Sequence, residues 1–161
     1  MKQKYYNYLS DEECLWFEFE SVSEQKTVRK VIVYSPFQNS PDVFNLGLVD
    51  ALEDGSYSDK TTTNNDDMAK VMATVIRTLL RFYEKYPLKM VYVEGSTAER
   101  TRLYRIIISR ELSEIENIFT VYGLSGSVSE LFKKNQSYDA FVIVLKNKEN
   151  LLKLLYESNN W

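Results

Sequence analysis

The residues best suited to chemistry follow a short apolar run and lead into a helical pattern. They are Gly95, Ser96, Thr97, Arg100, Arg102 and Tyr104. A strand that ends at a glycine directly before a helix leaves the first backbone N–H groups of that helix exposed, and such groups attract anions. Because helical side chains lean toward the N-terminus, Arg100 would extend back over the Ser96 turn. This pattern predicts a site for a phosphate or a nucleotide, in which Tyr104 closes the pocket or stacks on a base.

A purely structural interpretation of the same turn stays open. Ser96 and Glu99 have the spacing of a capping box, whose side chains satisfy the N–H groups that an anion would bind. Arg100 falls within the apolar arc of the helix, so it must meet a carboxylate, a phosphate or a carbonyl. An internal acid such as Glu94 or Asp50 could be that partner. The turn has one glycine and no following lysine, which excludes the Walker and dinucleotide-binding loops.

The side chains available for catalysis are limited. The chain has no histidine, so the usual general base near neutral pH is missing, as are Ser-His and Cys-His pairs. Cys14 stands in the acidic stretch SDEEC, an environment that disfavours a reactive thiolate. The acidic segment 53–67 lacks the spacing of a calcium-binding loop, so we expect no metal and no cofactor. Chemistry by Glu, Asp, Tyr, Lys or Arg stays open, but an enzyme is the less favoured hypothesis.

A basic stripe follows one face of the helix expected over residues 66–86. It consists of Lys70, Arg77, Arg81 and Lys85. Such a stripe could bind a phosphate backbone or an acidic partner, or it could be the solvated face of an amphipathic helix. The net charge of −3 favours the second interpretation and argues against nucleic acid as a partner.

The composition is that of an ordinary soluble protein, with 44% hydrophobic and 27% charged residues. A chain of 161 residues predicts a single globular domain, residues 1–161. The lone cysteine cannot form an internal disulfide, which fits a reducing compartment. Neither a signal peptide in MKQKYYNYL nor a membrane-spanning run is recognisable. We therefore expect a cytoplasmic protein that does not contact the membrane.

Hydrophobic periodicity predicts an α+β fold with a single mixed β-sheet, an N-terminal antiparallel meander followed by alternating helices and strands. The element order is β-β-β-α-β-α-β-(α)-β-α. The expected strands cover residues 15–20, 27–34, 43–52, 90–94, 118–124 and 138–145, the last of them in the middle of the sheet. The expected helices cover 66–86, 96–115, a short 127–134 and 148–157. We also expect the strands of the unit 90–124 to run parallel, joined by a right-handed crossover.

Two groups of motifs resemble a family of small bacterial proteins that carries a domain of unknown function. The first group, FNLG, TNND and KVMATV, covers Phe44–Gly47, Thr63–Asp66 and Lys70–Val75. The second, GSTAERTRLY, covers Gly95–Tyr104 and is the more specific. The likeness extends over roughly residues 15–144. It implies a bacterial cytoplasmic protein and transfers no activity, cofactor or catalytic residue.

Two functional hypotheses follow. The first is a non-catalytic binding or regulatory module that acts through contacts with another protein or with its own copy, since the 12 tyrosines and 8 phenylalanines are many and aromatic residues are favoured at interfaces. The second is a protein that binds or turns over a phosphorylated molecule or nucleotide at the Gly95 turn through Arg100 and Arg102. The group that Arg100 contacts distinguishes the two hypotheses. An internal carboxylate favours the first, and a bound phosphate favours the second.

Overall fold

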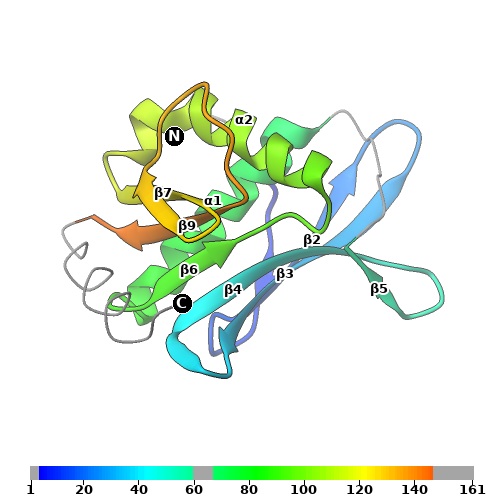
Figure 1. The fold of residues 1–161 in the computed structure, drawn as a ribbon. Helices are drawn as coiled ribbons and strands as arrows, with labels where there is room; N and C mark the ends of the chain where they lie inside the picture. Colours follow the sequence, from blue (N-terminus) through cyan, green and yellow to red (C-terminus); the bar gives the residue numbers. More distant parts are fainter. Residues whose placement is uncertain (1–3, 60–66, 147–161) are drawn as a thin grey trace. The chain divides into compact units, whose positions relative to one another are not determined.

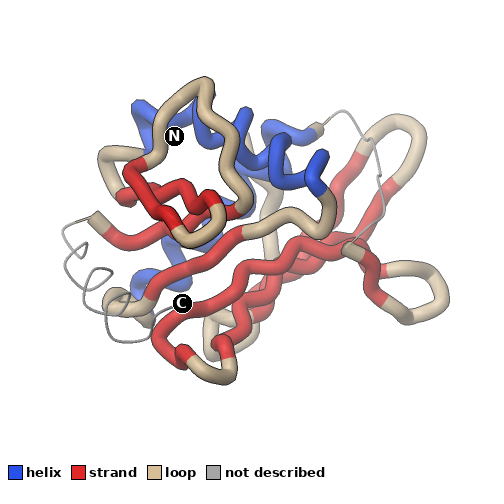
Figure 2. Tube along the Cα trace, in the orientation of Figure 1, coloured by secondary structure: helices blue, strands red, loops and turns tan. Residues whose placement is uncertain are grey.

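The computed structural model describes residues 4–59 and 67–146 (Figures 1 and 2). In these residues the fold is α+β with one mixed sheet, which confirms the predicted fold class. The strands are β1 (Leu9–Ser10), β2 (Trp16–Val22), β3 (Thr27–Phe37), β4 (Ser40–Ala51), β5 (Tyr57–Ser58), β6 (Met90–Val93), β7 (Phe119–Ser125), β8 (Val128–Leu131) and β9 (Ala140–Leu145). The helices are α1 (Met68–Lys85) and α2 (Ala98–Ile115). The strand order is β1-β2-β3-β4-β6-β9-β7-β8, and β5 pairs with β4.

The chain divides into two compact units. The first unit comprises Met1–Ser35 and Leu46–Lys85, and the second comprises Pro36–Asn45 and Tyr86–Trp161. Strand β4 contributes its first half to the second unit and its second half to the first. Each unit is described by itself below. The expectation of a single domain stays a prediction.

The first unit packs α1 onto one face of its strands. In β2 the buried Phe17 and Phe19 alternate with more exposed glutamates, as the period of two predicts. Phe17 pairs with Ile32 of β3 in antiparallel register. The ring of Tyr34, also on β3, stacks on Phe82 of α1 at 4.7 Å between ring centroids. Its hydroxyl shares a 2.8 Å hydrogen bond with Thr78, so a buried polar group is satisfied where helix and sheet meet.

Helix α1 lies within two residues of its predicted bounds. Thr74 stands one turn after Lys70 of the basic stripe, yet its relative exposure is 0%. Its hydroxyl donates to the Lys70 carbonyl at 2.8 Å and accepts the Tyr6 N–H at 2.9 Å. A threonine can be buried on a helix when both hydrogen-bonding roles of its hydroxyl are filled.

The second unit places β9 between β6 and β7, antiparallel to both. Strands β6 and β7 therefore run in the same direction, as predicted for the unit 90–124, but they are not neighbours. The apolar strand predicted over 138–145 does lie in the middle of this part of the sheet. One of its faces holds a cluster of Val43, Met90, Val142 and Val144, each at most 1% exposed.

The short helix predicted over residues 127–134 is wrong. Residues 128–131 form β8, which pairs with β7 in a hairpin where Ser125 faces Val128. Gly126 adopts φ 60° and, with Ser127, forms the two-residue turn between them. A Gly-Ser pair between two short runs is itself a hairpin signal, since glycine tolerates positive φ.

Other differences concern short or undescribed elements. Strands β1 and β5 were not predicted, and β5 lies within the segment 53–67 expected to be a loop. Both have two residues, too few for periodicity to indicate. The helix predicted over 148–157 lies outside the described residues, as does the whole TNND motif.

Candidate functional site

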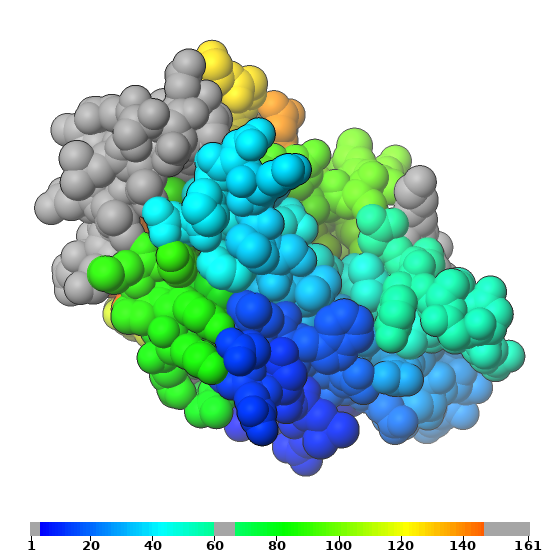
Figure 3. Space-filling view, turned by 90° about the horizontal axis from the view of Figure 1, so that it is seen from below, coloured from blue at the N-terminus to red at the C-terminus, as the bar shows by residue number. Residues whose placement is uncertain are grey.

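A groove of about 750 Å³ lies in the described part of the second unit, next to the predicted site residue Gly95. It is lined by Phe37, Gln38, Asn39, Ser40, Val43, Asn45, Tyr92, Glu94 and Gly95. These residues come from the hairpin that joins β3 to β4, from β4 itself, and from the end of β6 with the residues after it. The tip of the hairpin is exposed, and Figure 3 shows this part of the chain in light blue to cyan at the molecular surface.

Contacts within the second unit hold the two sides of the groove together. The rings of Phe37 and Tyr92 meet edge to face, with centroids 5.5 Å apart and planes at 85°. Lys89, the residue before β6, places its Nζ 2.5 Å from Oδ1 of Asp42 on β4. An aromatic pair and an ion pair thus join the β3–β4 hairpin to β6 and the residue before it, so the groove is formed by the fold itself.

Tyr92 and Glu94 form the polar centre of the groove. The Tyr92 hydroxyl donates a 2.5 Å hydrogen bond to Glu94 Oε1. Burial is the main cause that raises the pKa of the Tyr92 phenol, and the hydrogen bond and negative charge of Glu94 raise it further. The phenol therefore stays protonated at neutral pH, where it acts as a donor that orients the carboxylate and not as a base.

Gly95 packs directly against the first turn of α2. Its N–H donates to Thr101 Oγ1 at 2.9 Å. A Cβ on Gly95 would lie 2.7 Å from the Arg100 Cβ and closer still to the Thr101 backbone nitrogen. Only glycine fits here, and the reason is this close approach rather than a positive φ.

The cap of α2 differs from the predicted one. Thr97, with φ −134° and ψ 162°, is the N-cap residue, and its hydroxyl accepts the Arg100 N–H at 3.2 Å. The helix therefore begins at Ala98. A capping box of Ser96 with Glu99 is therefore wrong, because Glu99 does not occupy the position where it could complete one.

The predicted site residues do not all gather at the groove. Gly95 lines it, whereas Arg100 and Arg102 are absent from its described lining. Arg100 is half-buried and Arg102 is exposed on α2. The ring of Tyr104 is only 6% exposed, which leaves little of it for stacking on a base. An anion site at this turn stays a prediction.

Asp50 was suggested above as an acidic partner for Arg100, but it forms an ion pair with Lys30. Lys30 Nζ lies 2.6 Å from Asp50 Oδ1 within the first unit, and both side chains are almost fully buried. Lys30 was not predicted as a partner because a lysine in a strand normally faces water. In the register of β2 and β3 it stands opposite Phe19, on the buried face.

The basic stripe on α1 is engaged by the chain itself. Lys70 Nζ lies 4.2 Å from the Tyr6 ring centroid, and the Arg77 guanidinium lies 4.6 Å from that of Tyr5. Both are cation–π contacts to the N-terminal segment. Arg81 pairs with Glu84 at 2.8 Å.

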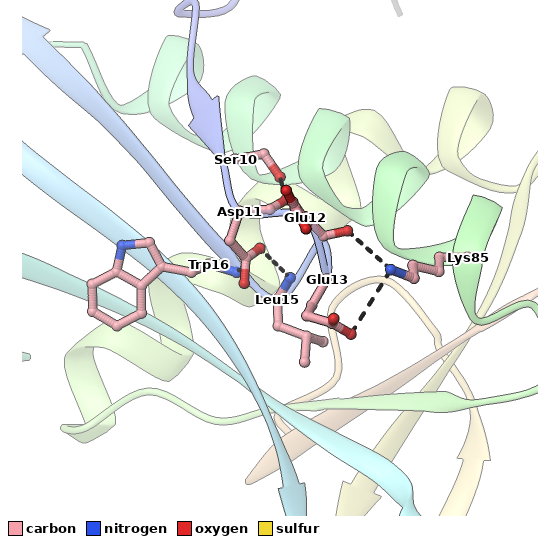
Figure 4. A network of polar contacts seen from close by, with 7 residues as sticks. All are labelled: Ser10, Asp11, Glu12, Glu13, Leu15, Trp16 and Lys85. Carbon is pink, nitrogen blue, oxygen red and sulfur yellow. Dashed lines mark hydrogen bonds and ion pairs between the residues drawn. The ribbon is translucent and has the colours of Figure 1, made fainter.

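The last cation of the stripe binds the β1–β2 turn. Lys85 donates to the Glu12 carbonyl at 2.9 Å and lies 3.8 Å from a Glu13 carboxylate oxygen (Figure 4). In the same view Asp11 Oδ1 accepts the Leu15 N–H at 2.9 Å and the Trp16 N–H at 3.1 Å, which closes the turn. The stripe therefore holds the N-terminal segment against α1.

Within 4–59 and 67–146, no three side chains of Cys, Asp or Glu come together in a way that could hold a metal ion. Neither of the helices described there has the length and apolarity needed to cross a bilayer.

Comparison with known protein families assigns the chain to a family. The model of the family of unknown function DUF6934 matches residues 2–146, which include both motif groups. The chain belongs to this family. No curated protein and no solved structure matches it significantly.

Proposed function

We propose that this chain is a non-catalytic binding module that holds an extended segment of another protein in the groove of the second unit. The observation that carries the proposal is the composition of the groove. Its lining combines the rings of Phe37 and Tyr92 with the side-chain amides of Gln38, Asn39 and Asn45. Aromatic surface supplies contact area, and amides can both donate to and accept from peptide groups.

The position of the groove supports a peptide as its occupant. It is bordered by an exposed hairpin, and Phe37 at its edge is 39% exposed. A volume of about 750 Å³ is large enough for a few residues of an extended chain. The groove is preformed by the contacts of Phe37 with Tyr92 and of Lys89 with Asp42, which lowers the entropic cost of binding.

A non-catalytic role is supported by the groups at the centre of the groove. Tyr92 stays protonated at neutral pH, and the chain has no histidine to act as a base. Binding of a nucleic-acid backbone by the basic stripe has less support, since its four cations contact groups of the chain itself. A cytoplasmic location in a bacterium is part of the proposal and rests on the motif resemblance and the single cysteine.

The alternative is a phosphate or nucleotide site at Gly95, Ser96 and Thr97 with Arg100 and Arg102. Its support is that Arg102 is exposed one turn from the start of α2. Thermal unfolding with nucleotides and inorganic phosphate tests it, because a ligand that binds the native state raises the midpoint. No shift of the wild-type midpoint with any of them, or a shift that is equally large in an Arg102→Ala variant, removes this alternative.

The proposed function is tested by peptide selection. A random-sequence peptide library is displayed and selected on the immobilised wild-type chain, with counter-selection on a Phe37→Ala variant. We expect enriched peptides that bind the wild type and a Leu131→Ala control, whose side chain is exposed on β8, but not Phe37→Ala. Enrichment that is equal on all three proteins, or no enrichment, contradicts the proposal. Self-association is tested separately by light scattering over a range of concentrations.

A further inference from the structure

We propose that Tyr92, Glu94 and Phe37 form a subsite for an arginine or lysine side chain of the bound segment, with arginine preferred. This inference rests on the proposed function and adds the chemical class of the segment. Three independent features of the second unit support it: a carboxylate without a cation, a pair of aromatic rings, and a lining that is otherwise neutral.

Glu94 is a carboxylate held in position but not neutralised. Its Oε1 accepts the Tyr92 hydroxyl, a neutral donor, at 2.5 Å. No lysine or arginine of the described residues pairs with it. The hydrogen bond fixes the carboxylate while its full negative charge and its second oxygen remain. An ionised, oriented acceptor in the lining of a groove is suited to a charge-assisted hydrogen bond with an incoming cation.

The surroundings of Glu94 also favour positive charge. The described lining of the groove contains no lysine and no arginine, and Glu94 is its only ionised side chain. The negative charge of Asp139 reaches the same phenol, because it adds to the causes that raise the pKa of Tyr92. The charge of Glu94 in this otherwise neutral lining repels an anionic segment and attracts a cationic one.

The aromatic rings distinguish the guanidinium group from other cations. Phe37 and Tyr92 meet edge to face, so their planes lie nearly at right angles beside the carboxylate. A planar guanidinium can stack on a ring face while its N–H groups bind an oxygen in its own plane. The ammonium group of lysine can make the same ion pair but cannot stack. Arginine is therefore the preferred side chain.

A titration with two matched small probes tests this subsite without knowledge of the partner. The probes are acetyl-arginine-amide and acetyl-citrulline-amide, which have nearly the same shape and differ in charge. Binding to the ¹⁵N-labelled chain is followed by backbone NMR shifts. We expect the arginine probe to shift Tyr92, Glu94 and Gly95 and to bind about fivefold more tightly than the citrulline probe.

Two variants locate the effect. Glu94→Gln keeps the shape of the side chain and removes its charge, so it should abolish the preference for arginine. Glu116→Gln, at an exposed position after α2, should leave it unchanged. Equal binding of the two probes, shifts outside the groove, or a preference that survives Glu94→Gln overturns the inference. If selected peptides bind the groove but contain no basic residue, this inference fails and the proposed function stands; if none binds the groove, both fail.

Discussion

The hydroxyl of Tyr92 on β6 and the carboxylate of Glu94, the residue directly after this strand, lie 2.5 Å apart. Because residues two apart in an extended chain point to the same side, the phenol can reach the carboxylate without a turn. This relationship positions the one ionised side chain in the groove lining, and it couples the charge of Glu94 to the proton of Tyr92.

The first prediction concerns alkaline pH. The folded-state pKa of Tyr92 is raised above the ordinary value of 10.0, so the folded and unfolded chains bind this proton equally below about pH 10. Above that pH the unfolded state loses the proton first, and the free energy of unfolding falls. We expect Tyr92→Phe to make this fall shallower, measured by urea unfolding between about pH 8 and pH 11. An unchanged slope would show that the phenol titrates normally.

The second prediction concerns Gly95. Its position against the Thr101 backbone nitrogen leaves no space for a Cβ, so Gly95→Ala should lower the free energy of unfolding by about 1–3 kcal/mol. The neighbouring Ser96→Ala variant serves as the control and should have a smaller effect. Equal stability of Gly95→Ala and the wild type would mean that the loop relaxes away from α2.

The third prediction concerns the start of α2. Thr97 is the N-cap residue, so Thr97→Ala should cost about 1 kcal/mol of stability. Glu99→Gln should cost less than half of this, because Glu99 completes no capping box. Chemical denaturation of both variants separates the observed cap from the one that the Ser96 and Glu99 spacing predicts, and a larger loss for Glu99→Gln would favour the capping box.

The fourth prediction concerns the buried ion pair of the first unit. Removing one partner, as in Asp50→Leu, leaves a buried charge on Lys30 and should cost about 3–5 kcal/mol. The double variant Lys30→Met with Asp50→Leu should regain most of that loss, since apolar residues of similar size can replace a buried pair. A double variant no more stable than the single one would show that the pair has a further structural role.

Much of the fold could be predicted because its main elements have strong periodicity. Helix α1 and strands β2, β6 and β9 lie within about two residues of the positions that their apolar patterns indicate. The element at residues 127–134 failed because a short amphipathic run fits a helix and a strand alike. The Gly126-Ser127 pair would have decided it, since such a pair favours a two-residue hairpin turn.

The candidate site could be predicted only in part, and the reason is topological. The GST motif led to Gly95, which does line the groove. Phe37 and Tyr92 stand on strands separated in sequence by β4, β5 and α1, so no local pattern could show that their rings meet. The ion pair of Lys30 with Asp50 could not be predicted for the same reason, because the two residues stand on different strands, β3 and β4. The cation–π contacts of Lys70 with Tyr6 and of Arg77 with Tyr5 could not be predicted, because no periodic pattern indicates where the tyrosines of the N-terminal segment pack.

The most direct test of the central claim is the affinity of a library-selected peptide for the wild type and for Phe37→Ala, measured by isothermal titration calorimetry. Truncation of an aromatic side chain that contacts the ligand should weaken binding about tenfold or more. The matched Leu131→Ala variant, whose side chain is exposed on β8 outside the groove lining, should bind as the wild type does. Affinities that are equal for the wild type and Phe37→Ala would place the binding surface elsewhere and contradict the account.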